Sequence, residues 1–226
     1  NVTATTLGGA CTTAAGVNAT VSVAIAGAST QNGTAACTTS AWTFTLTTVL
    51  SFDGIYSVTV TQSDTASNVG TSGAQSITVD KTIPVVTLAT VNGTARTFPY
   101  ISNATVTALG GTCGGAIGDS ATISVAITGA SVQNGTGACT AGTWTYTPTT
   151  ALSADGAYTI TATQTDTAAN TGTTGAQAIT VDRTVPVVTL TNVNGTARTF
   201  PFTTNTTVTT VGGACGITAD DASTVP

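Results

Sequence analysis

The sequence has no histidine, no methionine and no glutamate, and its 226 residues include only four basic ones, Lys81, Arg96, Arg183 and Arg198. Proteins bind nucleic-acid phosphates through clustered lysines and arginines, so this shortage argues against a nucleic-acid partner. It argues equally against a polybasic contact with a membrane surface. No Ser/His/Asp or Cys/His arrangement can be built without histidine, and the nine acidic residues are scattered aspartates. We therefore expect a protein that is not an enzyme.

Long hydrophobic runs are also absent. No apolar stretch approaches the roughly 18 residues of a membrane-spanning helix, and no signal peptide is visible, so we expect no membrane insertion in this segment. Charged residues make up only 6% of the chain, but hydrophobic residues make up 41% and alternate with polar ones. Disorder requires apolar residues to be scarce as well, so the chain is expected to fold.

An internal repeat of 102 residues runs through the sequence without a gap. The positions that coincide are Cys11, Cys113 and Cys215, Cys37 and Cys139, Trp42 and Trp144, Tyr56 and Tyr158, and Pro84 and Pro186. This period suits an independently folding domain, because solenoid repeats run about 20–50 residues. We predict a first copy over residues 1–81 that lacks its first strand, a complete middle copy over residues 82–183, and the N-terminal part of a third copy over residues 184–226. This pattern is typical of a segment taken from a longer series of repeated domains.

Two cysteines lie 26 residues apart in each of the first two copies, Cys11 with Cys37 and Cys113 with Cys139. Paired cysteines at one fixed spacing indicate a disulfide and an oxidising compartment, so we expect a secreted or cell-surface protein. A zinc site is disfavoured, because two thiols per copy without histidine cannot supply four ligands. Closing a loop of this length stabilises a domain by roughly 3–4 kcal/mol in the chain-entropy model.

The middle copy predicts six or seven short strands and no helix. The clearest strand is 121–128, where Ile123, Val125 and Ile127 alternate with small or polar residues. Further strands are expected at 84–91, 105–109, 143–147, 158–163 and 177–181, with turns at 92–93, 133–135 and 155–156. These features predict an all-β protein built as an antiparallel β-sandwich. We interpret the abundant threonines as β-favouring, soluble surface rather than an ice-binding face.

Two stretches at the end of the middle copy and the start of the third carry three short elements at fixed spacing: Leu152–Asn170, LSADGAYTITATQTDTAAN, and Ile179–Leu190, ITVDRTVPVVTL. The elements are D-G-x-Y, D-x-A-x-N and V-D-x-T-x-P, and the first copy repeats them. They resemble the bacterial Ig-like repeats of large secreted adhesins and biofilm-associated surface proteins. The resemblance implies tandem Ig-like antiparallel β-sandwich domains in a stiff extracellular stalk and assigns no ligand. A disulfide is unusual in this family. The cations Lys81 and Arg183, which directly follow Asp80 and Asp182 where one copy joins the next, also depart from the family pattern.

Some relatives of this kind bind calcium near the joint between domains, which implies a candidate site here. Its oxygen ligands would come from Asp64, Asn68, Asp80, Asp166, Asn170 and Asp182. Calcium takes six to eight oxygens, and each joint offers only about two carboxylates with a cation beside one of them. The alternative is that Asp64 and Asp166 cap turns, whereas Asp80 and Asp182 pair with the neighbouring cation. A melting temperature that excess chelator leaves unchanged would argue against calcium.

Eight N-x-S/T sequons are candidate glycosylation sites: Asn1, Asn18, Asn32, Asn92, Asn103, Asn134, Asn194 and Asn205. Several are Asn-Gly-Thr segments that hairpin turns favour for their own geometry. If the source glycosylates, exposed turn positions would be modified. An intact mass equal to that of the polypeptide would exclude the modification.

These observations favour a structural protein whose tandem Ig-like modules form the shaft of an extracellular fibre or filament. Identical modules present identical surfaces at a regular interval, so we expect self-association into a filament or sheath. The alternative is an adhesin whose modules bind carbohydrate or a partner protein. That alternative needs exposed aromatic residues, but Trp42, Trp144, Tyr56 and Tyr158 lie in alternating segments and are expected in the core.

Overall fold

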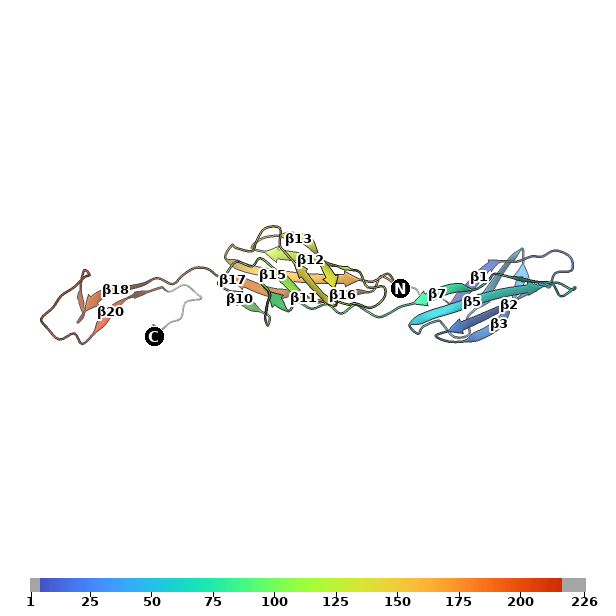
Figure 1. The fold of residues 1–226 in the computed structure, drawn as a ribbon, viewed down its shortest axis with the longest axis horizontal. Coiled ribbons are helices and arrows are strands. Elements are labelled where there is room, and N and C mark those ends of the chain that lie inside the picture. The colour runs from blue at the N-terminus through green and yellow to red at the C-terminus, as the bar shows by residue number, and fades with distance from the viewer. Residues whose placement is uncertain (1–4, 217–226) are drawn as a thin grey trace.

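The computed structural model describes residues 5–216, which form strands and no helix. Figure 1 shows three groups of strands that follow one another along the long axis of the molecule. They are a seven-stranded, a ten-stranded and a three-stranded sheet, each formed within one copy of the repeat. The predicted all-β sandwich is confirmed. Within residues 5–216 there is no helix long and apolar enough to cross a membrane.

The first copy contains β1 (Thr6–Ala10), β2 (Thr20–Gly27), β3 (Gln31–Thr38), β4 (Ala41–Thr45), β5 (Gly54–Ser63), β6 (Val69–Thr71) and β7 (Gln75–Val79). The strand order is β1-β4-β3-β2-β5-β6, and β7 also pairs with β5. β3 pairs with β2 along most of its length and with β4 at its end, so this strand joins the two layers. The core between the layers includes Ile25, Phe44, Leu50 and Tyr56.

The middle copy repeats this arrangement and adds strands before it. Its strands are β8 (Thr90–Val91), β9 (Thr94–Ala95), β10 (Tyr100–Ser102), β11 (Leu109–Thr112), β12 (Thr122–Gly129), β13 (Gln133–Thr140), β14 (Thr143–Tyr146), β15 (Gly156–Thr165), β16 (Thr171–Thr173) and β17 (Gln177–Val181). β10 runs parallel to β17, β8 pairs with β11, and β12 lies between β13 and β15. The core centres on Ile123, Trp144, Leu152, Tyr158 and Ile160.

The third copy contributes a small sheet of β18 (Val188–Val193), β19 (Thr196–Ala197) and β20 (Val211–Cys215), in the order β19-β18-β20. These strands correspond to β8, β9 and β11 of the middle copy. Neither hydrophobic core cluster of the described chain includes a residue of the third copy. Within residues 5–216 this sheet therefore has no core cluster of its own.

Several expected elements are confirmed. In β12, Ile123, Val125 and Ile127 are buried and the residues between them are exposed, as half-buried alternation predicts. The last predicted strand, 177–181, coincides with β17. Asn92 and Gly93 form a tight turn between β8 and β9, and both have positive φ, at 50° and 74°. Such a turn matches the twist of a hairpin.

The turn predicted at 133–135 is wrong, because these residues lie inside β13. Gly135 is a packing position: a Cβ there would lie 2.5 Å from Cε2 of the Tyr146 ring. Gly33 stands in the same relation to the ring of Phe44 in the first copy. A glycine within a strand often marks such a close approach, so the Asn-Gly-Thr segment here is part of the strand and does not form a turn. The actual turn precedes β13 and uses Gly129, whose φ is 108°.

The strand predicted at 105–109 is also misplaced. β11 begins at Leu109 and runs through Gly110 and Gly111, the residues expected to end it. Residues 84–91, here called the leading segment, lie across these glycines. A Cβ on Gly111 would overlap the carbonyl oxygen of Thr87. Glycine is therefore in this strand because the leading segment approaches so closely.

Candidate functional site

The four cysteines predicted to pair do so. Cys11 is joined to Cys37 and Cys113 to Cys139, each across 26 residues. Cys215 is free and exposed. Disulfides persist in oxidising compartments, which is consistent with a secreted or surface-exposed chain.

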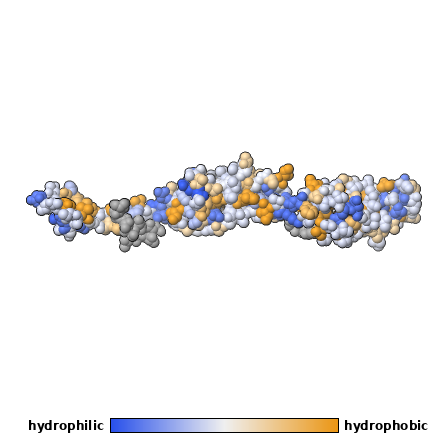
Figure 2. Space-filling view, turned by 90° about the horizontal axis from the view of Figure 1, so that it is seen from below, coloured by the Kyte–Doolittle hydropathy of each residue, from blue (hydrophilic) through white to orange (hydrophobic). Residues whose placement is uncertain are grey.

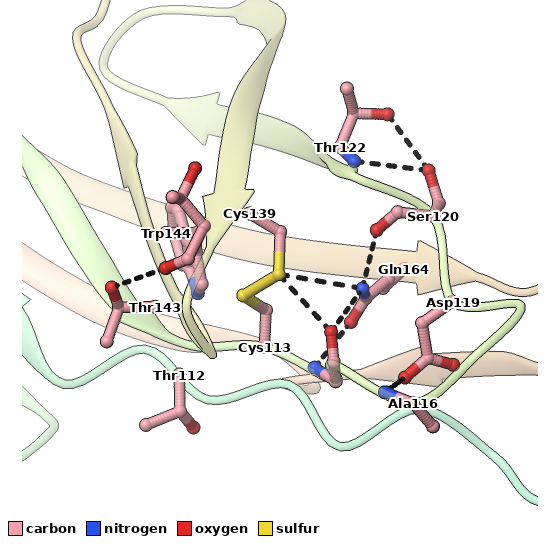
Figure 3. The surroundings of a disulfide bond; sticks show 12 residues. Thr112, Cys113, Ala116, Asp119, Ser120, Thr122, Cys139, Thr143, Trp144 and Gln164 are labelled. Atoms are coloured by element: carbon pink, nitrogen blue, oxygen red, sulfur yellow. Dashed lines mark hydrogen bonds between the residues drawn. A yellow bond between two sulfur atoms is a disulfide. The ribbon is translucent and has the colours of Figure 1, made fainter.

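A glutamine supports each disulfide loop, buried in the middle copy and partly buried in the first, and it was not among the residues predicted to be functional. Figure 3 shows Gln164 beside the Cys113–Cys139 bond. Its Nε2 donates to the carbonyl oxygens of Gly114 (2.9 Å) and Ser120 (2.7 Å), and its Oε1 accepts from the Gly114 N–H (2.7 Å). Gln62 makes the corresponding bonds in the first copy. The signal was present, because Gln164 continues the inward-facing series of Tyr158, Ile160 and Ala162 and so needed buried partners.

The joint between copies is held by an aspartate that was interpreted only as part of a turn. In the first copy, Asp53 Oδ1 accepts from the Lys81 N–H (3.0 Å), and Asp53 Oδ2 accepts from Thr82 Oγ1 (2.7 Å). Asp155 accepts from Arg183 N–H and Thr184 Oγ1 at the same two distances in the middle copy. The D-G-x-Y element thus fixes the segment that leaves its own copy.

The first joint is also short. β7 ends at Val79, and Pro84 is already buried in the middle copy, so only residues 80–83 connect the two packed bodies. Asn170 Nδ2 of the middle copy donates to the carbonyl oxygen of Asp80, at 2.9 Å. A Cβ on Gly172 would overlap the carbonyl oxygen of Pro84. The joint is therefore in contact with the D-x-A-x-N loop of the copy that follows it.

The residues proposed as calcium ligands form capped turns. Asp64 Oδ1 accepts from the N–H groups of Ala66 and Asn68 (2.9 Å each), and Asp64 Oδ2 accepts from Asn68 Nδ2 (2.8 Å). Asp166 and Asn170 repeat this pairing.

At the joints, Oδ1 of Asp80 accepts from Thr82 N–H, and Oδ1 of Asp182 accepts from Thr184 N–H. These bonds fit turn capping better than metal ligation, and residues 5–216 contain no group of three or more Cys, Asp, Glu or His side chains able to hold a metal ion. Calcium binding stays a prediction.

The hydrogen bonds lower the pKa of both turn aspartates below the ordinary value of 3.8. For Asp64 the largest cause is the side-chain hydrogen bond from Asn68, followed by the backbone N–H of Asn68. For Asp166, burial raises the pKa, but hydrogen bonds from the side chain and backbone of Asn170 outweigh it. Both carboxylates are thereby stabilised in the ionised form that the turn requires.

Replacing Asp166 by asparagine is expected to destabilise the middle copy at neutral pH and to matter less as the solution is acidified. The folded pKa lies below the unfolded one, so the carboxylate's contribution is complete above 3.8 and is lost as the pH falls through the folded value. Urea unfolding of both proteins from about pH 7 to about pH 2 would measure this. A difference in unfolding free energy that is constant over the range would contradict it.

The four aromatic residues expected in the core are there: Trp42, Trp144, Tyr56 and Tyr158 are all less than a tenth exposed. Each tyrosine hydroxyl donates four residues back along the chain, Tyr158 Oη to Ala154 O (2.9 Å) and Tyr56 Oη to Phe52 O (3.0 Å). This arrangement is the tyrosine corner of Ig-like sandwiches. These rings are therefore structural and are not available to stack on a sugar.

Figure 2 shows one face on which white predominates and the blue and orange areas are small. Two of the sequon asparagines stabilise the loops that follow their hairpins. Asn92 Nδ2 donates a hydrogen bond to Thr105 O, and Asn194 Nδ2 donates one to Thr207 O. Asn18, Asn32, Asn103, Asn134 and Asn205 are exposed, and Asn1 lies outside the described residues. Glycosylation stays a prediction.

Comparison with known proteins gives one family match. Residues 103–183 match the family model of the bacterial Ig-like domain. A crystal structure of a tetra-tandem repeat in the extending region of a large adhesion protein is 22% identical in sequence, with a TM-score of 0.38, and covers 84% of this chain and 48% of that one. A structure from a 1.5-MDa bacterial ice-binding adhesin is 17% identical, with a TM-score of 0.36, and covers 84% of this chain and 60% of that one. No curated protein matches the chain in sequence.

Proposed function

Residues 103–183 form a bacterial Ig-like domain, and from this premise we propose that the chain is part of the shaft of an extracellular fibre. The supporting observation is the joint. Four residues, 80–83, connect two packed bodies, and hydrogen bonds to Asp53 on one side and from Asn170 on the other hold them. Separate domains move relative to one another by default, and a short connection with hydrogen bonds on both sides restricts that motion, as a spacer requires.

The disulfides support an extracellular setting, because such bonds are rare in reducing compartments. Self-association into a filament or sheath is part of the proposal, because repeated copies present the same surface at one interval. The competing function, an adhesin whose modules bind carbohydrate or a partner protein, has less support, since both tryptophans and the repeated tyrosines Tyr56 and Tyr158 are buried in the core. Calcium at the joints would stiffen them further, and unfolding temperatures measured with calcium and with excess chelator would decide whether it binds.

Replacing Asp53 by alanine is expected to loosen the first joint while leaving both sandwiches folded. Spin labels on Thr34→Cys and Thr136→Cys, in a Cys215→Ser background, would report the separation of the first and middle copies. Both positions are exposed and are equivalent in the repeat. We expect a single narrow distance distribution in the parent protein and one several times broader after Asp53→Ala, because the anchors of Lys81 and Thr82 are lost.

The matched control is Asp155→Ala, which removes the same bonds from the second joint and should leave this distance distribution unchanged. A broad distribution in the parent protein would refute the stiff shaft. A distribution that Asp53→Ala does not widen would show that the aspartate does not hold the joint.

A further inference from the structure

One long strand in each of the first two copies has a sheet edge without a partner. Residues 133–137 of β13 pair with β12 only, because β14 joins this strand at Ala138. Residues 31–36 of β3 likewise pair with β2 only, and β4 joins at Cys37. Figure 1 shows β13 along the upper margin of the middle copy and β3 along the lower margin of the first. These two stretches are here called the β13 edge and the β3 edge.

The register of β13 determines which of its backbone groups point outward. Cys139 N–H donates to Ala121 O, at 2.8 Å, so the odd-numbered residues of β13 exchange hydrogen bonds with β12 in this antiparallel pair. The N–H and C=O groups of Asn134 and Thr136 therefore point away from β12. Among residues 5–216 they have no backbone hydrogen-bond partner on that outer side.

The first copy repeats this geometry. Cys37 N–H donates to Ala19 O, also at 2.8 Å, so Asn32 and Thr34 present their backbone groups to the β3 edge. The side chains of these two residues are exposed, as are those of Asn134 and Thr136. A row of unpaired N–H and C=O groups on a strand is a template for a further strand.

Neither edge carries the features that normally keep the sheets of different molecules apart. Natural edge strands are blunted by charged side chains, by proline or by short length. β3 and β13 are eight residues long, and neither contains a charged residue or a proline. On the other side of the same sheet, β10 and β16 are only three residues long. The long edge is thus the one that remains open to another strand.

The distribution of charge favours a second copy of this chain as the partner. The chain has a net charge of -5, so two copies repel each other wherever their aspartates meet. No charged side chain occurs between Asp119 and Asp155, and none precedes Asp53. These two spans contain β13 and β3, so two copies that meet at these edges bring no like charges together. Each edge also offers the donors and acceptors that the same edge of another chain requires.

We propose that chains associate side by side by pairing the β13 edge, and likewise the β3 edge, with the same edge of a second chain. The paired strands are antiparallel and related by a two-fold axis at Gly135. Asn134 N–H donates to the carbonyl oxygen of Thr136 in the second chain, Thr136 N–H donates to that of Asn134, and the axis doubles both bonds. Gly135 has no side chain to obstruct the approach at the axis. The β3 edge pairs in the same way about Gly33, as strand addition to a free sheet edge generally does.

The two edges lie on opposite margins of the molecule in Figure 1, so each chain can pair with two neighbours. Association then extends through a row of chains and does not stop at a dimer. Each further edge on a chain also strengthens its attachment, because the second contact forms within an existing complex. The inference rests on the proposed self-association of the shaft and names the contact that makes it.

A charge placed on each edge tests the contact. In a Cys215→Ser background, sedimentation of the parent chain should show association that increases with concentration and passes beyond the dimer. Thr34→Lys combined with Thr136→Lys should weaken this association at least several-fold, because the two-fold pairing brings the introduced charges of two chains to one contact. The unfolding temperature should not change, since both positions are exposed. Thr136→Lys alone should stop the association at the dimer, because the β3 edge remains.

The matched control is Ser57→Lys combined with Thr159→Lys, which changes the net charge equally. These residues lie on β5 and β15, and both strands are paired on each side there, so the control should associate as the parent does. An equal loss in the control, or association that the edge lysines do not weaken, would overturn the proposal. Protein with the intact mass of the polypeptide is used, because Asn32 and Asn134 are sequon asparagines. A parent chain that stays monomeric up to millimolar concentration yet keeps a narrow spin-label distance would refute edge pairing and leave the shaft standing.

Discussion

Replacing Gly172 by alanine is expected to destabilise the middle copy by roughly 3–5 kcal/mol. The new methyl group would overlap the carbonyl oxygen of Pro84, a backbone atom that can yield only if the leading segment moves. Moving it exposes Val86 and Leu88, and each buried side chain of this size contributes about 1.5–3 kcal/mol. Urea unfolding followed by tryptophan fluorescence would measure the loss, because Trp144 bonds to the same segment.

The matched control is Gly70→Ala, the same substitution at the equivalent position of the first copy. Its Cβ would be 3.7 Å from the nearest neighbouring atom, in ordinary contact, so the first copy should unfold at an unchanged denaturant concentration. Equal losses at the two glycines would mean that both positions are sensitive for a local reason. That result would contradict the claim that Gly172 is needed to make room for the leading segment.

Removing the Cys113–Cys139 disulfide by a double alanine substitution is expected to cost about 3–4 kcal/mol of unfolding free energy. The bond closes a loop between residues separated by 26 positions, and in the chain-entropy model its main effect is to restrict the unfolded chain. Unfolding of the double variant and the parent in urea, under identical oxidising conditions, would give the difference. A cost below about 1 kcal/mol would contradict a bracing role.

The corresponding change at Cys11 and Cys37 should cost a similar amount, because the sequence separation is the same.

The features that sequence predicted well are those with a strong local period. Alternation in 121–128 located β12 and its buried face, and the positions of Trp144 and Tyr158 predicted their burial. The fixed spacing of the cysteines predicted both disulfides. In each of these cases the residues concerned are neighbours in one strand or are repeated between copies, so a single sequence contains the information.

The features that sequence did not predict depend on contacts between distant residues. Gly135 looks like a turn glycine until the ring of Tyr146 is placed against it, and Gly111 looks like a strand end until Thr87 crosses it. Asp53 was expected only in a turn, yet its partners Lys81 and Thr82 lie 28 and 29 residues away. Long-range packing therefore overrode the local turn preferences of Asn-Gly and Asp-Gly.

Small-angle X-ray scattering of the dilute, monomeric chain tests the stiff shaft most directly. If consecutive copies are held in line by the Asp53 and Asn170 contacts, the scattering should show the signature of a rod, with one cross-section and a single extended length. Replacing Asp53 by alanine should shorten the average length. A compact particle, or the broad distribution of lengths that freely jointed domains give, would contradict the proposal that this chain is a spacer.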